Sequence, residues 1–338
     1  MNNIYQKLRF FSRLKNPRIK LAGIEFLHLT GKRYLGIFLD PVLACNFRCK
    51  MCYFSDPEIR KTYTGKMDHN QLNKVAKALF HRALKLQIGC GAEPTLYKEL
   101  AHIVRLGRLY NIPYISMTTN GNLLTGEQVE EYVRAGLDEL TISTHGIKKE
   151  TYEELMVNGD FDTFCRLLEI LAAVKKKYPA FKIRINYTMN EDNIEELKSL
   201  FTFFDGIPFD ILQLRPIQQI GDTAYHNFSL ERIHACYDEI IGPIREKCKK
   251  RNIILLAPTK ENLVVLEKEP ETDNSIAEMT YCYISPHHCW KDDFNPDTDT
   301  YESYTRRIGL TKKLFRKIFG KSAKKEKEVT RKLNYTID

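Results

Sequence analysis

Short segments rich in β-branched and aromatic residues alternate with longer segments of helical length, and this alternation constrains the fold most strongly. The predicted strands are Leu35–Val42, Leu84–Cys90, Tyr114–Thr119, Glu139–Ser143, Lys182–Met189 and Ile211–Pro216. The helices expected between them are Asp68–Arg82, Tyr97–Tyr110, Thr125–Ala135, Lys149–Met156, Phe161–Tyr178 and Glu191–Phe203. Because a helix separates successive strands, the strands run parallel in an α/β sheet or barrel, with active-site residues at their carboxyl ends.

The pattern changes after Gly221, which divides the chain into four regions. Residues 1–34 form a basic N-terminal extension and residues 35–221 the barrel. Residues 222–304 form a short α/β extension, with a helix near Leu230–Arg251, a strand at Ile253–Ala257 and a segment rich in Cys and His. Residues 305–338 form a basic amphipathic tail.

Composition and cysteine spacing indicate a cytoplasmic protein. The chain has 338 residues, of which 43% are hydrophobic, enough for a sizeable core, and it has no apolar run of membrane-spanning length. Glu25 and His28 interrupt the apolar stretch near the N-terminus, so we expect no secretory signal. The chain has nine cysteines, three of them within eight residues. An odd number with this spacing is typical of metal ligands and not of the disulfide framework of a secreted protein.

Cys45, Cys49 and Cys52 occur as CNFRCKMC, directly after the first predicted strand. Three thiolates this close cannot share one face of a helix or strand, so they curl around a common centre. A cubane of four irons normally takes four cysteines, and three leave one iron open, as in reactive metal centres. A zinc site or a set of buried reduced thiols is the alternative.

Further polar motifs follow the next three strands. The second strand ends in GCGAEPTL, where an ordinary turn is the alternative interpretation, and the third ends in TTNGNLLT, which contains Asn120. The fourth ends in ISTHG, which contains Ser143 and His145, and ETYEELMVNGDFDTF follows it.

The order of these motifs resembles the radical S-adenosylmethionine (SAM) superfamily, over roughly Leu35 to Gly221. The nearest group is the maturases with a C-terminal extension of the SPASM or twitch type, here shortened. Three positions depart from the family pattern: Met51 replaces an aromatic residue, Ala92 a glycine and His145 an aspartate.

The resemblance implies a partial (β/α)6 TIM-like barrel and two cofactors. Cys45, Cys49 and Cys52 would hold a [4Fe-4S] cluster whose open iron chelates the methionine part of SAM. One electron, from a flavodoxin or ferredoxin, would then cleave SAM to a 5′-deoxyadenosyl radical that abstracts hydrogen from the substrate. The residues at the family's SAM positions are Gly91, Ala92, Glu93, Asn120 and Ser143.

Alternation along the fifth and sixth strands adds further candidates. It places Arg184 and Asn186 on one face, which we expect to point into the barrel near SAM because polar groups are costly against a packed helical layer. Gln213 and Arg215 point inward similarly, toward the substrate. Each arginine is a candidate ligand for a carboxylate, and a structural ion pair is the alternative.

Cys282 and Cys289 bracket His287 and His288 in the C-terminal extension. This pair is a candidate for substrate contact, or for a second metal or cluster whose ligands His completes. Because the other cysteines outside the triplet have no clustered spacing, and free thiols are often buried, two core thiols are the alternative.

The two ends of the chain carry its positive charge. Residues 1–33 hold eight Lys or Arg against one acid, and residues 305–338 hold twelve against three, which leaves residues 34–304 at −7. The apolar residues at helical spacing in these ends are Ile4, Leu8, Phe11, Leu310, Leu314, Phe315, Ile318 and Phe319. Such helices can lie on an anionic membrane, cap the barrel, bind nucleic acid or dock with a solvated face.

We therefore hypothesise an anionic or membrane-associated substrate, such as a lipid-linked intermediate, at the inner face of the membrane, and favour this over nucleic acid. A different class of function is an iron–sulfur electron carrier or sensor without SAM chemistry. The GAEP segment argues against it, because a carrier needs no methionine site and normally closes all four cluster ligands.

Overall fold

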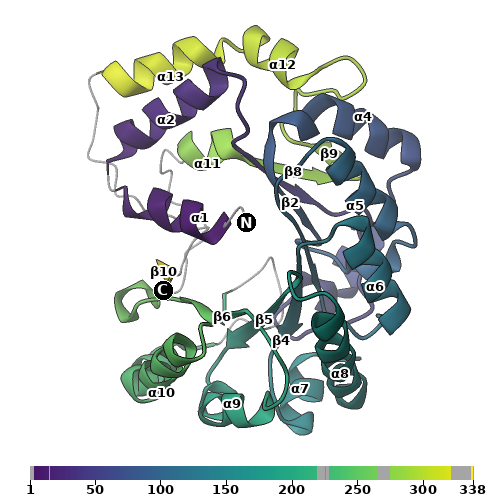
Figure 1. The fold of residues 1–338 in the computed structure, drawn as a ribbon, viewed down its shortest axis with the longest axis vertical. Helices are drawn as coiled ribbons and strands as arrows, with labels where there is room; N and C mark the ends of the chain where they lie inside the picture. Colours follow the sequence, from purple (N-terminus) through teal and green to yellow (C-terminus); the bar gives the residue numbers. More distant parts are fainter. Residues whose placement is uncertain are drawn as a thin grey trace.

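The computed structural model describes residues 4–14, 16–218, 225, 228–264, 275–320 and 336–337. All six predicted barrel strands are present, and they pair in parallel in chain order. Their bounds are β1 Leu35–Leu39, β2 Ala83–Ile88, β3 Ile115–Thr119, β4 Glu139–Thr144, β5 Lys182–Met189 and β6 Ile211–Pro216. The predicted α/β fold with a partial TIM-like barrel is confirmed (Figure 1).

The C-terminal extension lengthens the same sheet at both edges. β7 (Ile254–Ala257) pairs in parallel with β6, and β8 (Tyr281–Ser285) pairs in parallel with β1. The Cys/His segment is therefore a hairpin, in which β9 (His288–Cys289) folds back antiparallel to β8. Across the described residues the strand order is β10-β7-β6-β5-β4-β3-β2-β1-β8-β9, where β10 is Thr336–Ile337, and β7 does not pair with β8. The four proposed regions stay a prediction.

Helices follow the strands and cover the outer side of the sheet (Figure 1). Those of the barrel are α3 Pro57–Thr62, α4 His69–Leu79, α5 Leu100–Leu109, α6 Gly126–Ala135, α7 Lys149–Leu155, α8 Phe161–Lys177 and α9 Leu200–Phe203. Capping boxes begin α4 at Asp68 and α6 at Thr125, because each N-cap side chain accepts the backbone N–H three residues later. The predicted helix Glu191–Phe203 is instead a 3₁₀ helix over Ile194–Ser199 that continues into α9.

The remaining helices are α1 Ile4–Arg13, α2 Pro17–Leu29, α10 Glu231–Lys250, α11 Ser275–Thr280, α12 Tyr301–Arg307 and α13 Leu310–Phe319. α13 packs beside α2 through the buried Leu310 and Leu314 (Figure 1). Tyr301 of α12 joins this layer to the barrel, because its hydroxyl bonds His28 at 2.8 Å and the Arg82 guanidinium lies 4.4 Å from its ring centre. α2, α12 and α13 are thus docked on the barrel.

α1 closes the amino ends of the strands. Ile4 and Tyr5 are 4% exposed and share an apolar cluster with Tyr114. The Tyr5 hydroxyl donates to the carboxylate of Glu139, which also forms a 2.7 Å ion pair with Arg184. Burial alone would raise the pKa of Glu139, but the charges of Arg184 and Lys85 hold that pKa below its usual value. The N-terminal helix therefore seals the barrel through a buried, charged network.

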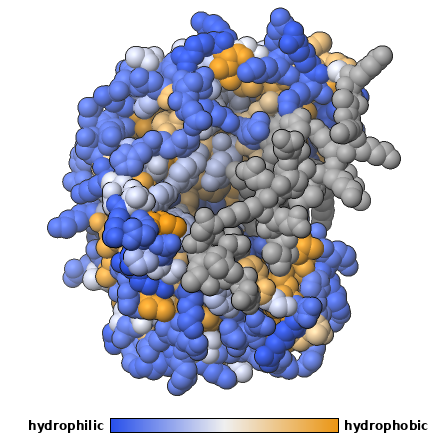
Figure 2. All heavy atoms as spheres, turned by 180° about the vertical axis from the view of Figure 1, so that it is seen from behind, coloured by the Kyte–Doolittle hydropathy of each residue, from blue (hydrophilic) through white to orange (hydrophobic). Residues whose placement is uncertain are grey.

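Two further observations describe the surface. Figure 2 shows the face opposite to that of Figure 1 as mainly hydrophilic, with hydrophobic residues in several separate places. Among the described residues, no helix combines the length and the apolar character that a bilayer crossing requires.

Replacing Glu139 by Gln removes the negative charge that Arg184 faces in a buried site. Because breaking one partner of a buried ion pair leaves an uncompensated charge, we expect a loss of about 3 kcal/mol in the free energy of unfolding. Denaturant titration followed by circular dichroism measures it. Glu130→Gln, which breaks an exposed ion pair with Lys177, is the matched control and should leave the midpoint unchanged. Equal midpoints for both variants would contradict the structural role of Glu139.

Candidate active site

The three cysteines of the triplet lie in the loop after β1 and converge. Burial and the charges of Glu93 and Cys52 raise the pKa of Cys45 to about 12, and the pKa of Cys49 is raised well above its usual value by burial and by Cys52 and Cys45. Three thiolates this close repel each other in a poorly hydrated site. A cationic centre that bridges them removes that repulsion, so the donor set fits an iron–sulfur cluster with three protein ligands.

The described residues contain no group of three or more His, Cys, Asp or Glu arranged to hold a single metal ion. In a cubane each thiolate binds a different iron, so its cysteines stand farther apart than the ligands of one ion.

Backbone hydrogen bonds fasten the cysteine loop to the segment that follows α7. The amide of Arg48 donates to the carbonyl of Val157 at 2.8 Å, and the amide of Lys50 donates to that of Leu155 at 3.0 Å. The Arg48 side chain also donates to the carbonyl of Cys45 at 2.6 Å. The LMVNGD part of the motif after the fourth strand, residues 155–160, therefore supports the loop that carries the cysteines.

Asp40, the residue after β1, organises the glycine-rich loop after β2. Its carboxylate accepts the backbone N–H of Cys90 at 2.7 Å and that of Gly91 at 3.0 Å, and the hydroxyl of Tyr283 at 2.9 Å. A Cβ at position 91 would lie 2.6 Å from the Tyr53 hydroxyl, so a larger residue there would displace the Tyr53 side chain from the loop. Because Asp40 accepts these amides, they are not available to an anionic ligand. The Gly91 carbonyl accepts the Tyr53 hydroxyl, and its second lone pair remains for a donor on a cationic ligand.

Glu93 ties the ends of β2 and β3 together. Its carboxylate accepts the hydroxyl of Thr119 at 2.6 Å, the amide of Asn120 at 2.8 Å and the hydroxyl of Thr95 at 2.6 Å. Burial raises its pKa, and these hydrogen bonds oppose that shift. Its own amide donates to the carbonyl of Ala44, next to Cys45. Glu93 therefore links three loops beside the cysteines.

Asn120 is joined to the cysteine loop by a side-chain contact. Its Nδ2 donates to Oδ1 of Asn46 at 2.8 Å, while its own Oδ1 accepts the amide of Asn122 at 3.0 Å. The structure thus brings Asn120, Glu93 and the triplet together, as the order of the motifs predicts.

Ser143, near the carboxyl end of β4, and Asn186, in the middle of β5, lie side by side. They are partners in the strand register, and Asn186 is 8% exposed. Oδ1 of Asn186 is buried and has no hydrogen-bond partner in the protein. Because an unpaired buried acceptor is costly, this oxygen is suited to a ligand group that donates a hydrogen bond.

Arg184 and Gln213 point into the barrel, as alternation predicts, and hydrogen-bond each other at 3.1 Å. However, the ion pair with Glu139, the first residue of β4, places Arg184 toward the amino ends of the strands. The cysteine loop lies at the opposite ends, so we do not include Arg184 among the SAM contacts. Its charge is used structurally, which was the alternative interpretation.

Arg215 and His145 lie near each other above this network. Arg215 is exposed, and its charge, together with burial, lowers the pKa of His145 to about 4, with burial the larger cause. The imidazole is therefore neutral at physiological pH, and its Nδ1 is buried without a hydrogen-bond partner. Arg215 stays a candidate for contact with an anionic substrate.

The substrate prediction for Cys282 and Cys289 requires correction. The Tyr283 hydroxyl reaches Asp40 inside the barrel, so Cys282, its neighbour along β8, points to the other face. Cys282 is 0% exposed within the hydrophobic core, and Cys289 packs against that core. Burial and the neighbouring Cys289 raise the pKa of Cys282. Both thiols therefore contribute to the core, and we propose no second metal there.

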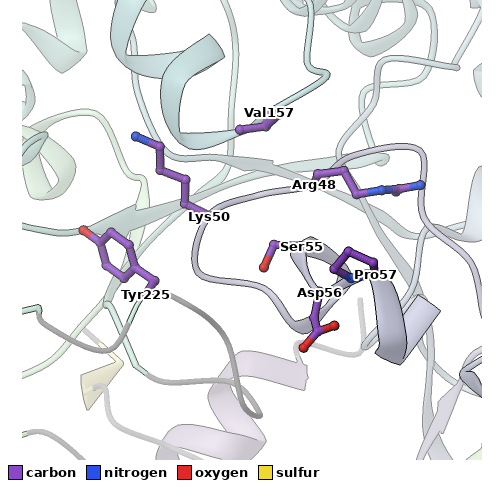
Figure 3. Close-up of a pocket in the computed structure, with 7 residues that line it drawn as sticks. All are labelled: Arg48, Lys50, Ser55, Asp56, Pro57, Val157 and Tyr225. Carbon is purple, nitrogen blue, oxygen red and sulfur yellow. The ribbon is translucent and has the colours of Figure 1, made fainter. Parts of the chain in front are cut away.

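A pocket of about 600 Å³ opens beside the cysteine loop (Figure 3). It is lined by Arg48, Lys50, Ser55, Asp56, Pro57, Val157 and Tyr225. Arg48 and Lys50, which flank Cys49, bring cationic side chains to this pocket close to the triplet. Asp56 also lines it, and Lys50 forms a 2.6 Å ion pair with Glu154. None of the residues predicted to contact SAM lines it, which makes it a separate space next to the cofactor site.

Sequence reasoning missed Asp40, Asn46, Tyr53 and Tyr283 as site residues. Asp40 did carry a signal, because it is an acidic residue that directly follows an apolar strand. Tyr283 carried none, because its role depends on the pairing of β8 with β1 across more than 240 residues.

Comparison with known families covers the region just described. The Radical SAM superfamily matches residues 40–210. Two curated proteins named probable GTP 3′,8-cyclase, from Metallosphaera sedula and Saccharolobus islandicus, are each 30% identical to the chain, over 179 and 178 residues. The matches cover 52% of this chain and 54% and 55% of the relatives, so the chain spans about half the length of the curated relatives it matches.

Two solved structures share the fold. Streptococcus suis SuiB bound to S-adenosylmethionine gives a TM-score of 0.57 at 16% identity, over 75% of this chain and 59% of SuiB. The protein anSMEcpe with bound AdoMet and Cp18Cys peptide gives 0.52 at 20% identity, over 65% of this chain and 62% of its own. The family match includes the cysteine triplet and the motifs after β2, β3 and β4. The chain belongs to the radical SAM superfamily.

Proposed function

We propose that the protein cleaves SAM reductively and uses the product to abstract hydrogen from an anionic substrate. In this chemistry one electron passes to the sulfonium, the C–S bond breaks to give methionine and a 5′-deoxyadenosyl radical, and hydrogen transfer from the substrate yields 5′-deoxyadenosine. The observation that carries the proposal is the convergence of three thiols beside a glycine loop whose amides are held by Asp40.

Each part of the SAM site has its own support. Cys45, Cys49 and Cys52 would hold the cluster. The carbonyl groups of the loop at Gly91 and Ala92 would accept hydrogen bonds from the SAM ammonium, because Asp40 orients the loop amides away from it. The remaining contacts are proposed for Glu93, Asn120, Ser143 and Asn186.

The substrate is proposed to be anionic. Arg48 and Lys50 line the pocket next to the triplet, and Arg215 adds positive charge inside the barrel, where Gln213 lies beneath it. Because the relatives are named GTP 3′,8-cyclases, GTP is the first substrate to test. The chain matches only about half the length of those relatives, so its substrate can differ from theirs. If GTP is not converted, other anionic substrates are tested next.

Two partners complete the proposal. Radical SAM enzymes need a reductant, and we propose a flavodoxin or a ferredoxin. We also propose that the protein works at an anionic membrane surface, because Lys and Arg are concentrated at the two ends of the chain while the body is acidic.

Cys49→Ala should abolish both the brown iron–sulfur absorption and the formation of 5′-deoxyadenosine from SAM, because two thiolates cannot hold the cluster. The measurement is anaerobic reconstitution, reduction and chromatography of the nucleoside products. Cys282→Ala is the matched control, since that thiol lies in the core away from the barrel interior, and it should retain both signals. A wild-type protein that forms the cluster but no 5′-deoxyadenosine would overturn the proposal in favour of an electron carrier or sensor.

Asp40→Asn should weaken SAM binding about tenfold, because an amide accepts through one oxygen only and its NH₂ group opposes the loop amides. Titration of the cluster-loaded protein with SAM measures the dissociation constant. Asp68→Asn, which changes an N-cap on α4 that has no contact with the loop, should bind SAM like the wild type. An unchanged dissociation constant for Asp40→Asn would remove Asp40 from the positioning of this loop.

A further inference from the structure

Exposed aromatic residues are concentrated on α1, α2 and α13. In the described part of the chain these helices carry every phenylalanine that is largely exposed. These are Phe10, Phe11, Phe26, Phe315 and Phe319. Phe26 and Phe319 are 65% and 69% exposed. Single exposed apolar residues are ordinary, but such a concentration indicates a surface that meets an apolar partner.

α2 is apolar on its outer face as well as its inner face. Ile19, Ala22, Phe26 and Leu29 are spaced by three, four and three residues, so they form one stripe along the helix, and all four are exposed. The opposite face packs into the core through Leu21 and Ile24. A helix that covers a soluble barrel ordinarily shows polar residues outward, so this stripe has no role in the fold itself.

α13 packs next to α2, also carries exposed aromatic residues and adds positive charge. Phe315 and Phe319 lie one turn apart with ring centres 4.5 Å from each other. The exposed cationic residues of the same helix are Lys312, Lys313, Arg316 and Lys317. The Arg18 side chain of α2 donates to the carbonyl of Gly320, so the two helices lie together (Figure 1). We call α2 and α13 together the basic aromatic face.

Charge indicates the partner of this face. α2 carries Arg18 and Lys20 and one acid, Glu25, whose pKa is raised by burial, and residues 310–320 carry four Lys or Arg and no acid. A second copy that met this face with its own basic aromatic face would present the same positive excess, so symmetric self-association through this face is opposed. Nucleic acid neutralises the charge but offers no hydrocarbon to Ile19 and Leu29. An anionic bilayer provides both phosphate groups and hydrocarbon.

We propose that the basic aromatic face docks on an anionic lipid bilayer, with Phe26, Phe315 and Phe319 in the interfacial region and the cationic side chains at the headgroups. The proposal rests on the proposed membrane location and deepens it by naming the surface, but it does not depend on SAM chemistry. Docking there would hold the barrel beside the membrane, where a lipid-linked substrate is available.

Sedimentation with vesicles tests the proposal in the full-length, cluster-loaded protein. The vesicles contain phosphatidylcholine with or without phosphatidylglycerol. We expect binding only with phosphatidylglycerol, and a loss of about tenfold or more in the partition coefficient for the triple variant Phe26→Ser, Phe315→Ser, Phe319→Ser. Lys312→Gln with Arg316→Gln should weaken binding too, and added salt should weaken it further.

The matched control replaces Leu109 and Leu123 by Ser, because these leucines are 72% and 42% exposed on another part of the surface. This control should bind vesicles like the wild type. Each variant is first checked for a wild-type circular dichroism spectrum and melting temperature. The proposal is overturned if the wild type stays in the supernatant with phosphatidylglycerol, or if the triple variant binds as tightly as the wild type.

Two further results would replace the bilayer by another occupant. Concentration-dependent dimers that the triple variant abolishes, without vesicle binding, would assign the face to a second copy. Binding of a single-stranded oligonucleotide in place of vesicles would assign it to nucleic acid. Formation of 5′-deoxyadenosine, measured on the same samples without vesicles, separates failure of the docking proposal from failure of the proposed chemistry.

Discussion

The carboxylate of Asp40 organises the candidate site more than any other group. It lies at the carboxyl end of β1, accepts two amides of the loop after β2, and accepts the hydroxyl of Tyr283 from β8. One buried acceptor thus joins three neighbouring strands next to the cysteine loop. Because buried carboxylates are costly without donors, each of these contacts is needed, and the loop conformation follows from them.

The polar groups that stabilise the fold and those suited to a cofactor lie in different parts of the barrel. At the amino ends of the strands, Glu139 and Arg184 compensate each other beneath α1, and the Tyr5 hydroxyl completes the network. At the carboxyl ends, burial and the neighbouring thiols raise the pKa of Cys49, and within the barrel Oδ1 of Asn186 has no hydrogen-bond partner in the protein. Polar groups that the fold leaves unsatisfied are the ones suited to a cofactor.

Much of the fold was predictable from local pattern. The bounds of β5 and β6 match their predicted ranges, because alternation and turn residues define them within a few positions. The triplet, Glu93 and Asn120 were predictable as a site because parallel strands bring their carboxyl ends to one edge. The structural role of Arg184 was not predictable. Period-two alternation shows which face of the sheet a residue lies on, but not whether it is near the amino or the carboxyl ends of the strands.

The sequence by itself determined the α/β alternation, the cysteine spacing and the concentration of positive charge at both ends, since each is a property of neighbouring residues. The tertiary structure decided which strands became neighbours. Pairing β8 with β1 brought Tyr283 to Asp40 and turned Cys282 into the core. Packing α13 on α2 brought helices with exposed phenylalanines from the two ends of the chain next to each other. Contacts across hundreds of residues depend on the whole packing arrangement, and no local pattern records them.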